Sequence, residues 1–290
     1  MEKQKILVIL GPTASGKSDL AVRLAKKLNG EIISADSRQV YKGLNVGTGK
    51  ITKKEMRGIP HHLLDVADPK KSFSVAQYKT LAEGSLKDIK AKNKLPIVVG
   101  GTGFYIDTLA GNISLPEVGP NKLLRSKLEK LNKEKLFAML KKKDPKRAQT
   151  IDSNNKVRLI RALEIVGAIG KVPPLGNPVS KWQFIYVGIK PDDLEKRIEK
   201  RVKKMFRLGL LREIENLKKA RVTNKRLKEL GFEYWNPTEE SVVTKSKRYA
   251  KRQMQWFKRN KKIKWFTLSM VEGFKPEEYK KIEKYVKEKL

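Results

Sequence analysis

The first third of the chain alternates between short apolar runs and segments of helical periodicity. Apolar runs at Ile6–Leu10 and Pro96–Val99 are typical of buried strands, and Glu31–Ala35 indicates a shorter one. Apolar positions three and four residues apart predict helices over 18–28 and 75–91. Strands that alternate with helical crossovers predict an α/β fold with a parallel sheet, in which ligands bind at the carboxyl ends of the strands.

The pattern changes after residue 115. Proline and glycine interrupt it at 116–120, Lys-rich helical segments follow, and a helix is predicted over 155–169 before a second Pro/Gly-rich stretch at 170–178. The first of these segments carry leucines at their apolar positions: Leu123, Leu124, Leu128, Leu131, Leu136 and Leu140. We therefore predict a helical insertion domain over 116–180 between two parts of one α/β core, residues 1–115 and 181–290.

The pattern of the core resumes after the insertion. A strand is predicted over 182–189, a long helical stretch over 192–219, a strongly basic helix over 239–259 and a strand over 262–268. The chain closes with an amphipathic helix over 275–290, whose inward side chains are Tyr279, Ile282, Tyr285 and Val286.

Basic residues are in large excess in this chain of 290 residues. Lys and Arg number 66 against 31 Asp and Glu, which gives a formal net charge of +35. Such a field attracts polyanions, with nucleic acid the first candidate and an anionic membrane surface the second. The absence of cysteine excludes disulfides and thiolate chemistry. Because the chain enters its first strand directly and has no apolar run near ~18 residues, we expect a soluble, cytoplasmic protein with no signal peptide and no membrane span.

The sharpest motif joins the first strand to the first helix and reads Gly11-Pro12-Thr13-Ala14-Ser15-Gly16-Lys17-Ser18. A glycine loop that ends in Gly-Lys-Ser between a strand and a helix is the context of a phosphate loop, or P-loop. Its backbone N–H groups and the helix N-terminus bind a di- or triphosphate. In such a loop Lys17 reaches the terminal phosphate oxygens and the Ser18 hydroxyl ligates Mg²⁺. We therefore predict a P-loop parallel-sheet core with Mg²⁺ as cofactor.

Other features narrow the chemistry of this P-loop. A hydrolysing NTPase usually ends a hydrophobic strand with an acidic residue, but here Ile97-Val98-Val99 runs into Gly100-Gly101, which disfavours a nucleotide motor or switch. Asp36 follows the second strand, where a carboxylate can take a proton from a nucleophile approaching the bound phosphate ester; a turn-forming role is the alternative. Thr13 and Thr102 are hydroxyls that either face this cleft or serve only in turns.

Several motifs together resemble the tRNA dimethylallyltransferases (isopentenyl-tRNA transferases, the IPP transferase family). They follow the P-loop in order over almost the whole chain: Ser34-Ala35-Asp36-Ser37-Arg38-Gln39-Val40-Tyr41, Pro60-His61-His62-Leu63-Leu64-Asp65, Gly100-Gly101-Thr102-Gly103-Phe104-Tyr105, Arg158-Leu159-Ile160-Arg161-Ala162-Leu163-Glu164, Arg197-Ile198-Glu199-Lys200-Arg201 and Lys251-Arg252-Gln253-Met254-Gln255-Trp256-Phe257-Lys258. The resemblance implies transfer of a dimethylallyl group from dimethylallyl diphosphate to N6 of adenosine 37, next to the tRNA anticodon. It implies that the P-loop binds an allylic diphosphate rather than ATP, in an enzyme that we expect to be a monomer.

The resemblance gives roles to individual residues. Lys17, Ser18 and the loop amides would stabilise charge on the departing diphosphate with the help of Mg²⁺, and Arg201 would bind the same diphosphate. Asp36 would accept the N6 proton, and Thr13 would help to position the amine or a diphosphate oxygen. Asp36, Thr13 and Arg201 are thus the predicted catalytic residues. The target adenine would be flipped out of the anticodon loop to reach them.

The resemblance also implies a tRNA-binding surface that includes residues of the insertion domain. Its members are Asp36, Ser37, Arg38, Gln39, Thr102, Arg125, Val157, Arg158, Leu159, Ile160, Arg161, Lys228, Gly231, Phe232, Lys251, Arg252, Gln253, Trp256 and Lys258. Basic side chains beside an aromatic one suit a splayed RNA loop, but for Trp256 itself we favour a place in the core. Val157 stands where the family usually has glutamine, and Phe232 where tyrosine is common. Because Pro/Gly-rich segments bound the insertion domain, we expect it to move when tRNA binds.

Two other functions fit parts of the sequence. A P-loop kinase of a small nucleoside or metabolite would also use Asp36 and the P-loop, but it has no need of the +35 charge or the basic C-terminal helix. A tRNA-binding chaperone with a vestigial loop would have no use for Lys17, Ser18 and Asp36 together. The adjacent His61 and His62 have poor spacing for zinc, so we expect a structural role for them.

Overall fold

The computed structural model describes residues 4–174, 180–269 and 275–290, and the chain divides into two compact units. One unit combines residues 1–110 with 179–290, and the other is the continuous segment 111–178. The inserted segment therefore begins and ends slightly earlier than the 116–180 expected from the sequence. The last residues of its Pro/Gly-rich exit, 175–178, lie outside the described residues.

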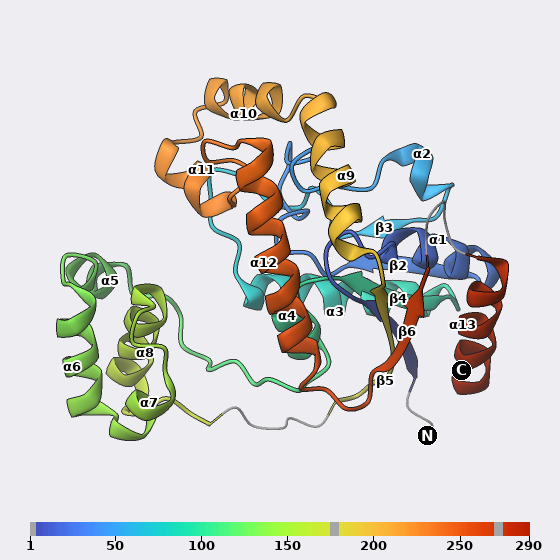
Figure 1. Cartoon of the computed structure of the whole chain (residues 1–290). Coiled ribbons are helices and arrows are strands. Elements are labelled where there is room, and N and C mark those ends of the chain that lie inside the picture. Colours follow the sequence, from blue (N-terminus) through green and yellow to red (C-terminus); the bar gives the residue numbers. More distant parts are fainter. Residues whose placement is uncertain (1–3, 175–179, 270–274) are drawn as a thin grey trace. The chain divides into compact units, whose positions relative to one another are not determined.

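Six strands form the sheet of the first unit (Figure 1). They are β1 (Lys5–Leu10), β2 (Gly30–Ser34), β3 (His61–His62), β4 (Leu95–Gly100), β5 (Gln183–Pro191) and β6 (Lys264–Leu268). Their order is β3-β2-β4-β1-β5-β6, and every neighbouring pair is parallel. This confirms the predicted α/β class. The edge strand β3 is two residues long and was not predicted, because it has no apolar run.

Helices cover both faces of the sheet, because successive side chains of each strand point to opposite faces. Helices α1 (Lys17–Lys27) and α13 (Pro276–Lys289) pack with the odd-numbered apolar residues of β1. Helices α3 (Val75–Ala91) and α4 (Gly103–Leu109) pack with the even-numbered ones. The inward side chains predicted for α13 do contribute to the first of these cores: Ile282 and Val286 are fully buried, and Tyr279 and Tyr285 are partly buried.

Between β5 and β6 the chain forms four helices: α9 (Leu194–Arg207), α10 (Leu210–Lys219), α11 (Asn224–Leu230) and α12 (Glu239–Phe257). The single helical stretch predicted over 192–219 is in fact two helices, because Gly209 adopts a left-handed φ of 91° between α9 and α10. The predicted basic helix over 239–259 is α12, which packs on α9 through small and branched apolar side chains. A short helix α2 (Lys53–Met56) and helices α4 and α11 escaped prediction, as elements of four to seven residues.

The second unit is a bundle of four helices: α5 (Lys122–Leu128), α6 (Lys133–Lys143), α7 (Pro145–Thr150) and α8 (Lys156–Ile169). Each begins at an Asn or Asp whose side chain accepts a hydrogen bond from a backbone N–H of the first turn. Its core contains most of the leucines named as apolar positions in the sequence, but Leu123 is 78% exposed. Helical geometry turns it away from its neighbour Leu124, which packs on the core.

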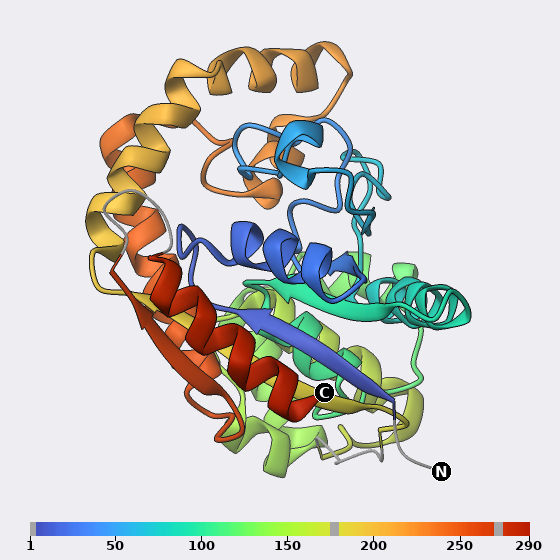
Figure 2. The same cartoon turned by 90° about the vertical axis from the view of Figure 1, so that its right-hand side faces the viewer.

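The pairing of β1 with β5 joins the two parts of the first unit across the inserted segment. Lys5 lies opposite Gln183 and Leu10 opposite Gly188, in continuous parallel register. The C-terminal helix closes the same region, since Lys5 Nζ donates a hydrogen bond to the carbonyl of Leu290 at 2.7 Å. Figure 2 shows α13 in red beside the blue β1. The central strand β1, with the loop that follows it, is thus held by segments from both ends of the sequence.

The buried carboxylate of Glu31 ties the sheet edge together. It is 1% exposed and contacts His62 Nε2 at 2.8 Å and Lys94 Nζ at 2.9 Å, so His62 serves the structural role predicted for it. Burial alone would raise the pKa of Glu31, but the hydrogen bonds from Lys94 and His62 outweigh it and lower the pKa from 4.5 to about 2. A carboxylate whose pKa is lower in the folded protein than in the unfolded chain stabilises the fold at pH values above its unfolded-state pKa. This stabilisation is lost as the pH falls through the folded-state pKa.

Glu31→Gln is therefore expected to lower the free energy of unfolding by about 2 to 3 kcal/mol at pH 7. The difference from wild type should shrink as the pH falls from about 5 to about 2, because the pKa at which Glu31 takes up a proton is 4.5 in the unfolded chain but about 2 in the folded protein. Urea denaturation of both proteins across this pH range measures the effect. An equal difference at pH 3 and pH 7 would assign the loss to packing instead of charge.

Candidate active site

A cavity of about 340 Å³ lies at the carboxyl ends of the central strands. The loops after β1 and β2 and the end of β4 line it together with residues of α9 and α12. The following predicted site residues border it: Thr13, Lys17, Ser18, Asp36, Ser37, Arg38, Gln39, Arg201, Lys228, Gly231, Phe232, Arg252 and Gln253. The motifs that follow β1, β2 and β4 meet in one cavity, because these strands are parallel and end on the same side. Residues of α9, α11 and α12 complete its lining.

The loop from Gly11 to Ser18 has the strand–loop–helix context expected of a P-loop. It leaves β1, and Gly16 adopts a left-handed φ of 83° directly before α1, which starts at Lys17. Two distant side chains support the loop: Arg197 Nε donates to the carbonyl of Ala14 at 2.7 Å, and the Thr13 N–H donates to Gln253 Oε1 at 2.8 Å. The helix N-terminus and the loop amides form a site for an anion.

Two cations converge on this cavity. Lys17 Nζ donates to the carbonyl of Pro12 at 3.1 Å, and Arg201 Nη2 donates to the carbonyl of Thr48 at 2.7 Å. Burial and the neighbouring charge of Arg201 lower the pKa of Lys17 from 10.5 to about 8, although Asp36 raises it in part. Burial likewise lowers the pKa of Arg201. Desolvated cations that destabilise one another are stabilised by a multivalent anion between them.

Asp36 and Thr102 organise the turn after β2. Asp36 Oδ1 accepts hydrogen bonds from the N–H groups of Arg38 at 2.8 Å and Gln39 at 3.3 Å, and its carboxylate also lines the cavity. Thr102 Oγ1 accepts the Ser37 N–H at 3.0 Å. Asp36 thus forms the turn and also borders the cavity, so both of the roles considered for it are compatible with the structure. Thr102 stabilises the turn but is not among the residues that line the cavity.

Glu233 is a second carboxyl group in the cavity, beside Asp36 and the two arginines Arg38 and Arg201. Burial raises its pKa from 4.5 to about 7, because the charges of Arg38 and Arg201 compensate the desolvation only in part. Glu233 follows Phe232, which the resemblance assigns to tRNA, but no sequence pattern distinguishes Glu233 as a titrating group. The place of Glu233 in the cavity could not be inferred from the sequence alone.

Hydrogen bonds from Gln253 and Trp256 attach helix α12 to neighbouring elements of the first unit. Gln253 is 6% exposed; besides accepting the Thr13 N–H, its Nε2 donates to the carbonyl of Gly101 at 2.8 Å. Trp256 Nε1 donates to Asp107 Oδ2 at 2.6 Å, and its ring packs against the core, as favoured from the sequence. In contrast, Lys251, Arg252 and Lys258 are exposed. The inner face of α12 therefore supports the P-loop, while its outer face carries positive charge.

The remaining predicted tRNA-binding residues belong to the second unit: Arg125, Val157, Arg158, Leu159, Ile160 and Arg161. Val157 and Arg158 are exposed, whereas Leu159 and Ile160 are buried in the core of this unit. Glu164 holds two of the arginines, since Arg125 Nη2 lies 2.6 Å and Arg161 Nη1 3.6 Å from Glu164 Oε2. The exposed polar surface of α8 thus contains Arg158, beside apolar Val157.

The described residues contain no group of three or more His, Cys, Asp and Glu side chains able to hold a metal ion. At the P-loop they offer the hydroxyl of Ser18 as a metal ligand, and this residue borders the cavity. One hydroxyl fits an octahedral Mg²⁺ whose other ligands are phosphate oxygens and water.

Among the residues that the structure describes, no helix is both long and apolar enough to cross a membrane.

Comparison with known proteins gives a consistent result. The family model described as IPP transferase matches residues 39–260. A tRNA dimethylallyltransferase of Anoxybacillus flavithermus is 39% identical over 283 residues, which cover 92% of this chain and 91% of the relative. The enzyme of the same name from Bacillus subtilis is 38% identical over 288 residues, with 92% of each chain covered.

Solved structures agree with these relatives. The full-length tRNA isopentenylpyrophosphate transferase of Bacillus halodurans matches with a TM-score of 0.73 and 34% identity over 99% of this chain and 97% of its own. A eukaryotic dimethylallyltransferase, solved acting on tRNA, matches with a TM-score of 0.77 and 28% identity over 91% of this chain and 74% of its own. Since family model, relatives and fold all coincide over most of its length, the chain belongs to the IPP transferase family, the tRNA dimethylallyltransferases.

Proposed function

We propose that this protein transfers a dimethylallyl group from dimethylallyl diphosphate to N6 of adenosine 37 in tRNA, leaving N6-isopentenyladenosine and diphosphate. One observation carries the proposal: Lys17 and Arg201 border the same cavity as the carboxylate of Asp36. The cations suit the leaving diphosphate, and the carboxylate suits the proton that the acceptor must lose. We further propose that the enzyme acts as a monomer in the cytoplasm.

The donor diphosphate would bind at the P-loop. Its oxygens would accept hydrogen bonds from the loop N–H groups at the N-terminus of α1, and from Lys17 and Arg201. As the bond between the allylic C1 and the diphosphate oxygen breaks, its electron pair passes to the oxygen. The two cations then stabilise a charge that exists only after the bond begins to break, which lowers the barrier.

Mg²⁺ bound to the diphosphate would have Ser18 as its protein ligand, and its chemistry would be to neutralise negative charge on the leaving group. The side chains of Lys17 and Arg201 would likewise neutralise negative charge on the leaving diphosphate. The Lys17 ammonium and the Arg201 guanidinium cannot shift without breaking the hydrogen bonds that hold them to the carbonyls of Pro12 and Thr48. The donor site is therefore largely preorganised.

The acceptor amine would approach from the side of Asp36. A new bond forms between N6 and C1 of the allyl group, and the proton that N6 loses passes to the Asp36 carboxylate. The backbone N–H groups of Arg38 and Gln39 fix that carboxylate through Oδ1, so its orientation does not depend on the substrate. Thr13, on the P-loop, lies at the same cavity and would position the amine or a diphosphate oxygen.

A flipped adenine is needed to reach Asp36, and tRNA contacts would hold the anticodon loop while this happens. The exposed basic side chains of Lys251 and Arg252 on α12, and of Lys258 directly after it, suit the tRNA backbone. In the second unit, the exposed Arg158 offers a similar contact. We propose that this unit contributes to tRNA binding and moves when tRNA binds; identical hydrogen exchange with and without tRNA would contradict the movement.

The function is tested with labelled dimethylallyl diphosphate, Mg²⁺ and tRNA from cells that lack the modification. Label is expected to appear in the tRNA at adenosine 37 with the wild-type protein, and much more slowly with Asp36→Ala. Label transfer that is equally fast with Asp36→Ala would refute the role of this carboxylate. Absence of label, together with phosphate transfer from ATP to a small acceptor, would refute the function itself.

Two neighbours on α12 are expected to affect different substrates. Arg252→Ala should weaken tRNA binding several-fold and reduce its salt dependence by about one phosphate contact, with a smaller effect on donor affinity. Gln253→Leu should instead weaken donor binding by roughly 10-fold, because the Thr13 N–H loses its partner and the P-loop its support. Equilibrium binding of tRNA and of pyrophosphate to each variant separates the two effects. Loss of tRNA affinity alone in Gln253→Leu would mean that Gln253 contacts tRNA directly.

A further inference from the structure

Glu213, on α10, is a buried acidic residue that no sequence motif singles out. Its carboxylate receives four hydrogen bonds. Oε2 accepts the N–H groups of Asn45 at 2.8 Å and Val46 at 2.7 Å, and Oε1 accepts the Gly47 N–H at 3.0 Å and the Tyr234 hydroxyl at 2.9 Å. Three successive backbone N–H groups converge on one carboxylate, the arrangement by which loops bind anions. Here the anion is a side chain of the protein itself, so its negative charge fixes the conformation of the loop.

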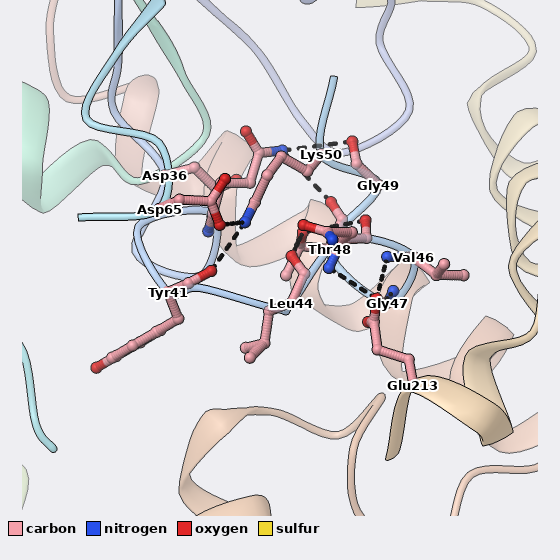
Figure 3. Close-up of polar contacts among 12 residues, drawn as sticks. Asp36, Tyr41, Leu44, Val46, Gly47, Thr48, Gly49, Lys50, Asp65 and Glu213 are labelled. Atoms are coloured by element: carbon pink, nitrogen blue, oxygen red, sulfur yellow. Dashed lines mark hydrogen bonds and ion pairs between the residues drawn. The ribbon is translucent and has the colours of Figure 1, made fainter. Parts of the chain in front are cut away.

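This loop, residues 44–50, is fixed from its other side as well (Figure 3). Thr48 Oγ1 donates to the carbonyl of Leu44 at 2.6 Å. The buried Lys50 Nζ donates to the carbonyl of Tyr41 at 2.8 Å and to Asp65 Oδ1 at 2.6 Å. Glu213 and Lys50 therefore hold the two ends of the loop, and the carbonyls between them have little freedom to rotate.

The backbone carbonyls of loop 44–50 hold Arg201 of the active site. The Thr48 carbonyl accepts the hydrogen bond from Arg201 Nη2 at 2.7 Å, and the carbonyls of Thr48 and Gly49 each lie 3.4 Å from Gln39 Nε2. The fit to Arg201 is tight, since a Cβ on Gly49 would lie 2.5 Å from Arg201 Nη2, and the left-handed φ of 54° at Gly49 also favours glycine. The chain of contacts runs from Glu213 through the loop to the Arg201 guanidinium.

We propose that Glu213 is a positioning residue for prenyl transfer: by fixing loop 44–50, it orients the Arg201 guanidinium toward the donor diphosphate. The inference rests on the proposed function, because it assigns the diphosphate as the ligand of Arg201. A glutamine at this position has one acceptor oxygen, and its NH₂ group would face backbone N–H groups. Glu213→Gln thus removes the charge and half of the acceptor set while keeping the size of the side chain.

The test uses Glu213→Gln, Arg201→Ala and the double variant, with Glu215→Gln as the matched control. Glu215 is an exposed glutamate on the same helix, so its substitution removes an equal charge without touching the loop. The readouts are pyrophosphate affinity without tRNA, kcat/KM for dimethylallyl diphosphate, KM for tRNA, and Tm.

Glu213→Gln is expected to lower pyrophosphate affinity and donor kcat/KM by about 10- to 100-fold, since a small displacement of a binding group costs this much. The KM for tRNA should change less than the donor kcat/KM, although the loop also contacts Gln39, and the Glu215→Gln control should stay at wild-type values. In the Arg201→Ala background, adding Glu213→Gln should change pyrophosphate affinity by less than about 2-fold, because both substitutions act through one contact. Fully additive losses, or wild-type pyrophosphate affinity in Glu213→Gln, would overturn the proposal.

Tyr234→Phe provides a milder variant if Glu213→Gln lowers Tm so far that it no longer folds. It removes one of the four hydrogen bonds to Glu213 and leaves the backbone N–H contacts in place. A smaller loss of pyrophosphate affinity that again disappears in the Arg201→Ala background supports the proposal, and an unchanged affinity in Tyr234→Phe overturns it. Wild-type protein that binds pyrophosphate but transfers no label to tRNA would refute the proposed function, and with it the role of Glu213 in prenyl transfer. The pyrophosphate affinities of the variants would then still test separately whether Glu213 orients Arg201 toward a diphosphate.

Discussion

Asp36→Asn is expected to slow prenyl transfer by about 10²- to 10⁴-fold, the range that a positioned general base contributes. Asparagine keeps an oxygen that can accept the N–H groups of Arg38 and Gln39, so the turn after β2 should persist. What it lacks is the ability to take the proton that N6 loses when the new C–N bond forms. Single-turnover kinetics with saturating tRNA and donor measure the chemical step directly.

The companion measurements for Asp36→Asn are tRNA affinity and pyrophosphate affinity, both of which should remain within about 3-fold of wild type. Asp88→Asn is the matched control, because Asp88 is an exposed aspartate on α3 that does not border the cavity. A single-turnover rate for Asp36→Asn close to that of wild type would show that the N6 proton leaves by another route. A large loss of tRNA affinity would show that Asp36 acts in binding instead.

The second large effect concerns Lys17 and pH. Burial and the charge of Arg201 lower the pKa of Lys17 to about 8, and the protonated form is the one that binds the diphosphate. Donor kcat/KM reports ionisations of the free enzyme, so it should be highest while Lys17 is charged and should fall as the pH rises through about 8. Lys17→Met should lower donor kcat/KM by about 10²- to 10³-fold at pH 7 and abolish this alkaline limb.

Glu233 must be separated from Lys17 in this profile, because burial raises its pKa to about 7 and its deprotonation adds negative charge to the donor cavity. Glu233→Gln should therefore remove any decline near pH 7 while leaving the limb near pH 8 in place. Comparison of the wild-type, Lys17→Met and Glu233→Gln profiles assigns each limb. An alkaline limb near pH 8 that persists in Lys17→Met would contradict the assignment to Lys17.

The parts of the site predicted from sequence are those whose geometry is local. The P-loop lies between β1 and α1, Asp36 follows β2, and Gly100 ends β4, so a correct set of parallel strands places all three at one edge of the sheet. Backbone sterics and apolar patterning determine such elements within a few residues of the chain. The roles inferred for Lys17, Asp36 and Arg201 remain proposals, but their shared cavity is a structural fact.

The features of the site that could not be predicted from the sequence depend on contacts between segments that are far apart in the chain. Gln253 reads as a polar residue in a basic helix, and the resemblance places it on the tRNA surface, yet its amide bonds to backbone groups of Thr13 and Gly101. Glu213 reads as one of several charges on an amphipathic helix, although its carboxylate holds the loop beside Arg201. Apart from the Tyr234 hydroxyl, which donates to Glu213, the partners in both cases are backbone groups, which carry no sequence signal.

The register of β1 against β5, across the whole inserted segment, has a consequence for biosynthesis. While the chain is being made, β1 can pair with β4 early, but its other edge must wait until β5 emerges after the second unit. An insertion with its own hydrophobic core can fold during that interval and shorten the flexible chain that the pairing must close. Until then the exposed edge of β1 is a template for pairing with another chain. Translation speed through the insertion should therefore influence how much of the protein aggregates before it folds.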